Sequence, residues 1–153
     1  MEATAKKYPE LFKSIYKEIK KDLKHNGITV VRKKFVSNVG RAWMEVKRIK
    51  IPIIKDIESI HVILHEIAHI KLNHSTRKIK LHTREFEAER YALSYMRRIG
   101  IHKIFPEDFK EIKEKAIDYV IHNINLDLSK GLKSNEINDK AIIFCKSKLK
   151  FKK

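Results

Sequence analysis

Residues Asp56 to Ile70 read DIESIHVILHEIAHI, and this stretch decides the fold because it contains no Lys or Arg in fifteen positions. At the average density of 35 Lys and Arg in 153 residues, fifteen positions would contain about three. Pro52 precedes the stretch, and the carboxylates of Asp56 and Glu58 suit the positive end of a helix. Apolar residues recur at helical spacing, at Ile57, Ile60, Leu64, Ala68 and Leu72. We therefore expect a buried helix.

The same helix carries an HExxH motif from His65 to His69. Its two imidazoles lie four residues apart, one turn along the helix, so both can bind one Zn²⁺ ion. Glu66 can then act as the general base toward a water molecule. Because the chain has eight histidines, a chance match has a probability of roughly 0.03. The alternative is a pair of ordinary core histidines that bind the backbone.

A second helix is predicted from Thr83, as the N-cap, to Gly100. Its apolar stripe, extended backward, contains Glu85 and Glu89, and two core-facing carboxylates require a cation. We expect Glu85 to be the third metal ligand and Glu89 to accept the free ring N–H of a ligand histidine. Glu87 should face solvent. The alternative is a solvated acidic first turn. The stripe consists of Ala88, Ala92, Met96 and Ile99.

The HExxH helix followed by Glu85-Phe86-Glu87-Ala88-Glu89 resembles the gluzincins, most closely the ImmA/IrrE-type zinc metallopeptidases. In that family the helix typically continues as HExxHxxLxH, and residues 65–74 read HEIAHIKLNH. The resemblance covers about residues 40–95. Glu89 stands where the family usually has Asp or Asn, and we find no helix-turn-helix. The resemblance implies a zinc-dependent endopeptidase that cleaves a transcriptional repressor or another DNA-associated protein.

His82 gives an alternative third ligand, as in SprT-like proteases that act on DNA-bound protein. Metzincin geometry is excluded, because it requires a glycine and a ligand where the chain has Leu72 and Ser75. His61 lies one turn before His65 and is expected to pack beside the site. His74 is expected either to line the cleft or to end the helix.

The transition state of peptide hydrolysis needs a hydrogen-bond donor for its oxyanion. Tyr91 and Tyr95 are the two residues that the sequence suggests for this role. The sequence does not decide between them.

The fold is predicted to be α+β, a minimal zincin-like single domain over residues 1–153. Ile28–Val36 and Arg41–Ile51 are rich in β-branched and aromatic residues, and Ser37–Gly40 between them is a turn signal, so a hairpin is expected. This small antiparallel sheet should pack on the HExxH helix, with Arg41–Ile51 as the edge that binds an extended peptide. Further helices are predicted at Pro9–Leu23 and from Pro106 onward.

The net charge of +16 makes a nucleic acid, or a protein bound to one, a plausible partner. The lysines are spread along the chain without a nucleic-acid-binding motif, which favours a merely solvated basic surface. A basic nucleic-acid or repressor-binding module with a non-catalytic metal site is the alternative function. The single Cys145 forms no intramolecular disulfide. Without a long apolar run or a signal peptide, we expect a cytoplasmic protein that does not enter membranes.

Overall fold

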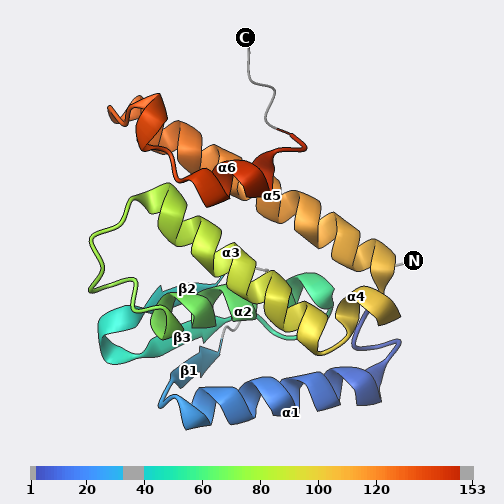
Figure 1. Cartoon of the computed structure of the whole chain (residues 1–153). Helices are drawn as coiled ribbons and strands as arrows, with labels where there is room; N and C mark the ends of the chain where they lie inside the picture. Colours follow the sequence, from blue (N-terminus) through green and yellow to red (C-terminus); the bar gives the residue numbers. More distant parts are fainter. Residues whose placement is uncertain (1–2, 33–39, 149–153) are drawn as a thin grey trace.

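The computed structural model describes residues 3–32 and 40–148, and these form an α+β fold with six α-helices and one three-stranded sheet. Figure 1 shows α1 on one side of the molecule, α5 and α6 on the other, and α2, α3 and the sheet between them. Met44–Val46 and Ser134–Glu136 are 3₁₀ turns. The elements in chain order are α1 (Pro9–His25), β1 (Thr29–Arg32), β2 (Arg41–Trp43), β3 (Arg48–Ile51), α2 (Ile57–Lys71), α3 (Leu81–Arg98), α4 (Ile101–Ile104), α5 (Pro106–Ser129) and α6 (Asp139–Cys145).

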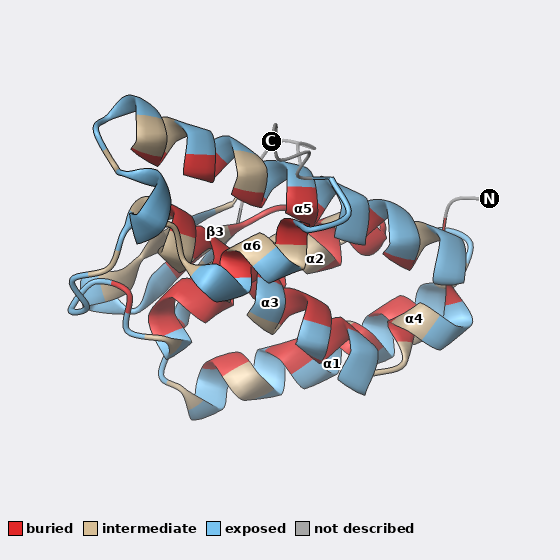
Figure 2. Ribbon diagram, turned by 45° about the horizontal axis from the view of Figure 1, so that its top comes forward, coloured by how far each residue is buried: buried red, intermediate tan, exposed pale blue. Residues whose placement is uncertain are grey.

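Helix α2 is the buried helix that the sequence predicts, and it begins at a capping box. The Ser59 amide donates to Oδ1 of Asp56 at 2.8 Å, and the Asp56 amide donates to Oγ of Ser59 at 3.2 Å. These two bonds satisfy amides that the first helical turn leaves unpaired. Helix α2 contacts α3, α5, β2 and β3, and Figure 2 shows how much of its surface is buried. Its position at the centre fixes the HExxH motif on a rigid element.

The sheet is mixed, so the predicted antiparallel hairpin is wrong. The strand order is β1-β3-β2, in which β1 pairs with β3 in parallel and β2 pairs with β3 antiparallel. The run from Arg41 to Ile51 forms two strands instead of one, because the chain reverses at Met44–Val46 and at Lys47, whose φ is 48°. The expected turn at Ser37–Val39 lies outside the described residues.

Of the run Arg41–Ile51, which the sequence predicts as the edge of the sheet, only Arg41–Trp43 forms an edge strand. Strand β3 is central, and Arg48–Lys50 is paired on both sides, so this part of the strand offers no free edge. Strand β2 lies at an edge of the sheet, next to α2. Among the described strands, the edges of the sheet are therefore Arg41–Trp43 and β1.

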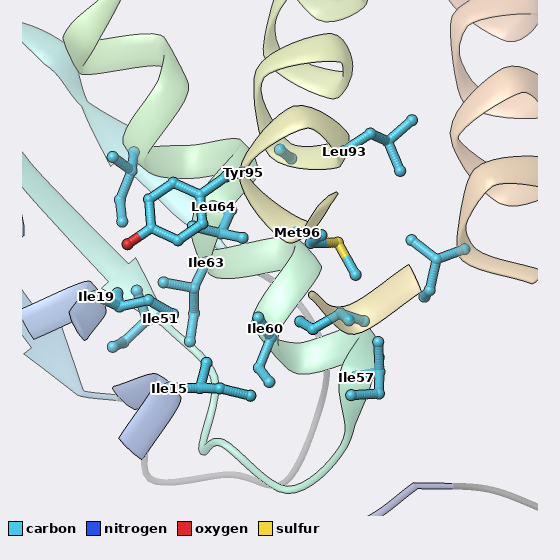
Figure 3. Packing of buried hydrophobic residues seen from close by; sticks show 14 of the residues in the cluster. Ile15, Ile19, Ile51, Ile57, Ile60, Ile63, Leu64, Leu93, Tyr95 and Met96 are labelled. Atoms are coloured by element: carbon cyan, nitrogen blue, oxygen red, sulfur yellow. The ribbon is translucent and has the colours of Figure 1, made fainter. Parts of the chain in front are cut away.

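The main hydrophobic core lies between α1, the sheet, α2, α3, α4 and the start of α5. Figure 3 shows Ile15 and Ile19 of α1 facing Ile60 and Ile63 of α2. A smaller cluster joins α3, α5 and α6, and it includes the buried thiol of Cys145. In the part of the chain that the structure describes, no helix is long and apolar enough to cross a membrane.

Helix α3 begins at Leu81, two residues before the predicted cap Thr83, because α5 supplies the capping group. The His82 amide donates to Oδ2 of Asp127 at 2.9 Å, so a first-turn amide is satisfied from a distant helix. The Asp127 carboxylate also replaces the side-chain cap that the sequence pattern assigned to Thr83. The helix ends at Arg98, and Gly100 follows with φ 85°.

Candidate metal centre

Three side-chain atoms from α2 and α3 converge in the interior. Nε2 of His65 lies 3.1 Å from Nε2 of His69 and 3.1 Å from Oε2 of Glu85. Nε2 of His69 lies 3.4 Å from the same oxygen. Two ligands about 2.0–2.1 Å from a tetrahedral ion lie about 3.3 Å from each other. All three residues are buried, and among the described residues this group could hold a metal ion.

The tautomer of His69 is set by a chain of side chains that ends on an ion pair. Arg77 binds Glu87 with two hydrogen bonds of 2.6 and 2.9 Å, and Oε2 of Glu87 lies 3.0 Å from Nε2 of His74. An ionised carboxylate only accepts, so His74 must donate from Nε2. Burial lowers the pKa of His74, although Glu87 opposes this, so its Nδ1 is an unprotonated acceptor.

Nδ1 of His69 lies 2.8 Å from Nδ1 of His74, so His69 is the donor in this contact. The Nε2 atom of His69 is then left with a lone pair, and this lone pair faces the other two donor atoms. A proton or a metal ion must lie between these three electron-rich atoms for the arrangement to be stable. The contacts from Arg77 to His69 therefore leave Nε2 of His69 able to accept a proton or to bind a cation.

His65 is bordered on its other side by Glu89. Nδ1 of His65 lies 3.0 Å from Oε1 of Glu89 as an ion pair that does not meet hydrogen-bond geometry. Nε2 of His61 lies 2.6 Å from Oε2 of Glu89. Glu89 thus lies where the sequence pattern places it, beside the ring nitrogen that faces away from the cluster. His61 contacts Glu89 and does not belong to the group of three.

The electrostatics of the cluster favour a positive charge at its centre. Burial alone lowers the pKa of His65, but Glu85 and Glu89 outweigh burial and raise this pKa to about 10. Burial raises the pKa of Glu89, but His61 and His65 outweigh it and lower this pKa to about 2. The pKa of Glu85 also falls well below its usual range, because His65 and His69 outweigh burial. The site therefore retains ionised carboxylates, which a divalent cation would neutralise.

Glu66 stands beside the cluster and is half-buried in the wall of a cleft. Burial raises its pKa, and this effect is only partly offset by His65 and His69. Gly40 packs on it so closely that a Cβ atom there would lie 2.6 Å from Cγ of Glu66 and 3.0 Å from Cγ1 of Val62. Only glycine allows the main chain before β2 to approach this carboxylate.

The cleft has two lobes, of about 380 and 230 Å³. One lobe is lined by apolar residues of α2 and α5 and by the Glu58–Lys115 ion pair, and the other by β2 and the start of α3. Four residues line both lobes and therefore mark their junction: Gly40, His65, Glu66 and Tyr119.

Tyr119 is the site residue that the sequence pattern missed. Tyr95 is buried in the main core, and Tyr91 packs against that core under the Lys71 ammonium group. Neither of them lines the cleft, whereas Tyr119 of α5 does. Burial and the charge of Glu85 raise the pKa of Tyr119 to about 12, so its hydroxyl group keeps its proton. The only sequence signal was an aromatic residue beside the buried Val120.

His82 lies away from the group of three. It is fully buried, its Nδ1–H donates to Oδ2 of Asp127 at 2.7 Å, and its Nε2 accepts from the Asn138 amide at 3.0 Å. Both ring nitrogens therefore join α3 to α5 and to the turn before α6. Glu87 lies outside the group of three and is partly exposed, as expected, but it is not merely solvated, because His74 and Arg77 of the connection between α2 and α3 bind it.

We predict that Glu87→Gln lowers the affinity for Zn²⁺ by about 10- to 100-fold, as is typical for partners of ligand histidines. The reason is that the side-chain amide of glutamine can donate a hydrogen bond to Nε2 of His74. The tautomers of His74 and His69 would then be reversed. Competition with a chromophoric chelator measures the affinity. Arg77→Gln is the matched control and should have a smaller effect, because it removes only the exposed end of the chain. Equal affinity of Glu87→Gln and the wild type would show that the chain does not orient His69.

Comparison of the chain with protein-family models, with curated proteins and with solved structures finds no match. The resemblance to ImmA/IrrE-type metallopeptidases therefore stays a prediction from the motif. What supports a function is the geometry of the side chains.

Proposed function

We propose that this protein is a zinc-dependent endopeptidase. The observation that carries the proposal is the convergence of Nε2 of His65, Nε2 of His69 and Oε2 of Glu85, 3.1–3.4 Å apart, beside Glu66 at the junction of an open cleft. Two histidines and one glutamate form a typical catalytic zinc ligand set, which keeps a fourth position open. Buried histidines that serve only the core would not need two imidazole nitrogens and a carboxylate oxygen to converge on one point.

The zinc ion would supply Lewis acidity and lower the pKa of a water molecule to about 7. Glu66 removes a proton from the attacking water and later gives it to the departing amine. Its raised pKa suits both transfers, because burial makes this carboxylate a stronger base than an exposed one. The paired carboxylates of Glu85 and Glu89 stay ionised and hold the imidazoles in place.

The peptide would bind extended along β2, an edge strand of the sheet as described, whose residues Arg41 and Ala42 line one lobe of the cleft. Main-chain pairing there is independent of side-chain identity, and the two lobes would contact side chains on either side of the scissile bond. A DNA-binding repressor as substrate follows from the motif resemblance. The net charge of +16 supports it, since it would draw the protein toward DNA and the proteins bound to it.

The alternative is a basic nucleic-acid or repressor-binding module with a non-catalytic metal site. The same net charge favours it, but it gives no role to Glu66 or to the cleft. The SprT-like alternative receives no support from the geometry, because His82 binds Asp127 and Asn138.

The test of the proposal is the metal content of the purified protein together with its cleavage of unfolded, fluorescein-labelled casein. We expect one zinc per chain by elemental analysis, loss of cleavage with a chelator, and recovery on adding Zn²⁺. A protein that holds no zinc, or cleavage that persists without metal, would contradict the proposal.

Gly40→Ala should lower kcat by about 10- to 100-fold without loss of zinc. The added methyl group overlaps Glu66, so the base must move, and a displacement of about 1 Å at a reacting group can cost 10²-fold. The measurements are casein cleavage and zinc content. Gly131→Ala is the matched control: its methyl group meets nothing within 4 Å, but φ is 104°, so it should reduce stability and leave kcat unchanged. An unchanged kcat in Gly40→Ala would show that this contact does not position Glu66.

A further inference from the structure

Tyr119 of α5 occupies the junction of the cleft, although it is distant in sequence from both zinc-binding helices. Its ring meets the His65 ring edge-on, with centroids 5.8 Å apart and planes at 73°. This contact does not bury the side chain, because Tyr119 is 43% exposed. A ligand in either lobe can therefore reach it.

Asn123 and Glu85 are neighbours of Tyr119 in the site. Nδ2 of Asn123, one turn further along α5, donates to the carbonyl oxygen of Tyr119 at 2.8 Å, and Asn123 is itself buried. Glu85 also acts on the phenol electrostatically, and Glu85 and Tyr119 line the same lobe of the cleft.

Elimination among the residues at the junction leaves Tyr119 as the side-chain donor. His65 uses Nε2 toward the metal group, Glu66 is an acceptor that serves as base, and Gly40 has no side chain. Arg84 lines only one lobe, and its Nε atom lies 3.6 Å from Glu85. A substrate that occupies both lobes must cross this junction. Among the described side chains there, the phenol group of Tyr119 is the neutral hydrogen-bond donor.

We propose that Tyr119 is a catalytic residue that donates a hydrogen bond to the carbonyl oxygen of the scissile bond as that oxygen becomes negative. This inference rests on the proposed peptidase function. When the water oxygen bonds to the carbonyl carbon, the carbonyl π electrons move to its oxygen, where the phenol stabilises them. When this oxyanion re-forms the double bond, the C–N bond breaks and the amine takes its proton from Glu66. One such donor typically contributes about 10²–10³-fold in kcat.

The test compares Tyr119→Phe with Tyr91→Phe, a matched control outside the cleft, in three measurements. These are kcat and KM on labelled casein, zinc affinity of the metal-free protein, and calorimetric affinity for N-phosphoryl-Leu-Trp against Leu-Trp. The phosphoryl group imitates the charge and tetrahedral shape of the transition state, so its binding reports on the donor without turnover. We expect Tyr119→Phe to lower kcat by about 100-fold and to weaken phosphoryl-dipeptide binding at least about 10-fold. KM, zinc affinity and Leu-Trp binding should stay near those of the wild type and of Tyr91→Phe.

Other outcomes overturn the inference in distinguishable ways. If the wild type binds zinc and Tyr119→Phe has the same kcat and the same phosphoryl-dipeptide affinity, Tyr119 has no catalytic role, and the proposed peptidase function stands. A loss of zinc affinity in Tyr119→Phe would show that the phenol instead positions Glu85. A wild type that binds no zinc would refute the proposed function itself, and the role of Tyr119 with it.

Discussion

Glu85→Ala should weaken zinc binding by more than about 100-fold while the fold stays intact. Changes in the partners of ligands typically cost 10- to 100-fold, so the loss of a ligand should cost more. Oε2 of Glu85 lies 3.1 and 3.4 Å from the two imidazole nitrogens, and without it the two histidines face no anionic ligand. Competition with a chromophoric chelator gives the affinity, and circular dichroism monitors the fold.

Two controls make this result specific. Glu10→Ala removes an exposed carboxylate from the first turn of α1 and should not change zinc affinity. His82→Ala should destabilise the fold, because it removes the buried imidazole that binds the Asp127 carboxylate and the Asn138 amide, and should retain zinc. If His82→Ala removes the metal and Glu85→Ala keeps it, the gluzincin assignment is wrong and a SprT-like ligand set replaces it.

The parts of the candidate site that lie on one helix could be predicted from the sequence. Residues 65 and 69 share a face because a helix repeats every 3.6 residues, so their distance hardly depends on tertiary structure. Glu85 and Glu89 were identified because two carboxylates extend an apolar stripe, and a buried stripe faces its neighbour. In each case the periodicity of a single helix determines the direction in which the side chain points.

The parts that depend on packing between distant segments could not be predicted. Tyr119 faces the site because α5 packs across α3 and α2, and its own periodicity does not show which neighbour it meets. His74 reaches Glu87 because the connection between α2 and α3 folds back. The sheet order depends on the chain reversal at Lys47, which has a left-handed backbone conformation. A glycine would have indicated such a reversal in the sequence, but this position has none.

Glu66→Gln should abolish most of the activity and keep the zinc. A general base contributes about 10²–10⁴-fold, and the amide cannot take a proton from water. Glutamine has nearly the same shape, so it preserves the packing of Gly40 against Cγ and Cδ of residue 66. The three converging donor atoms do not include Glu66, so they are unaltered.

The measurements are kcat on casein and zinc per chain, with Glu10→Gln as the matched control for the same change at an exposed site. A drop of at least about 100-fold in kcat at full zinc occupancy is expected. A binding module predicts the opposite, because its function does not need a base: Glu66→Gln would then bind a repressor or DNA as the wild type does. Retained casein cleavage in a zinc-loaded Glu66→Gln protein would mean that another group takes the proton, since no amide can replace the carboxylate in that step.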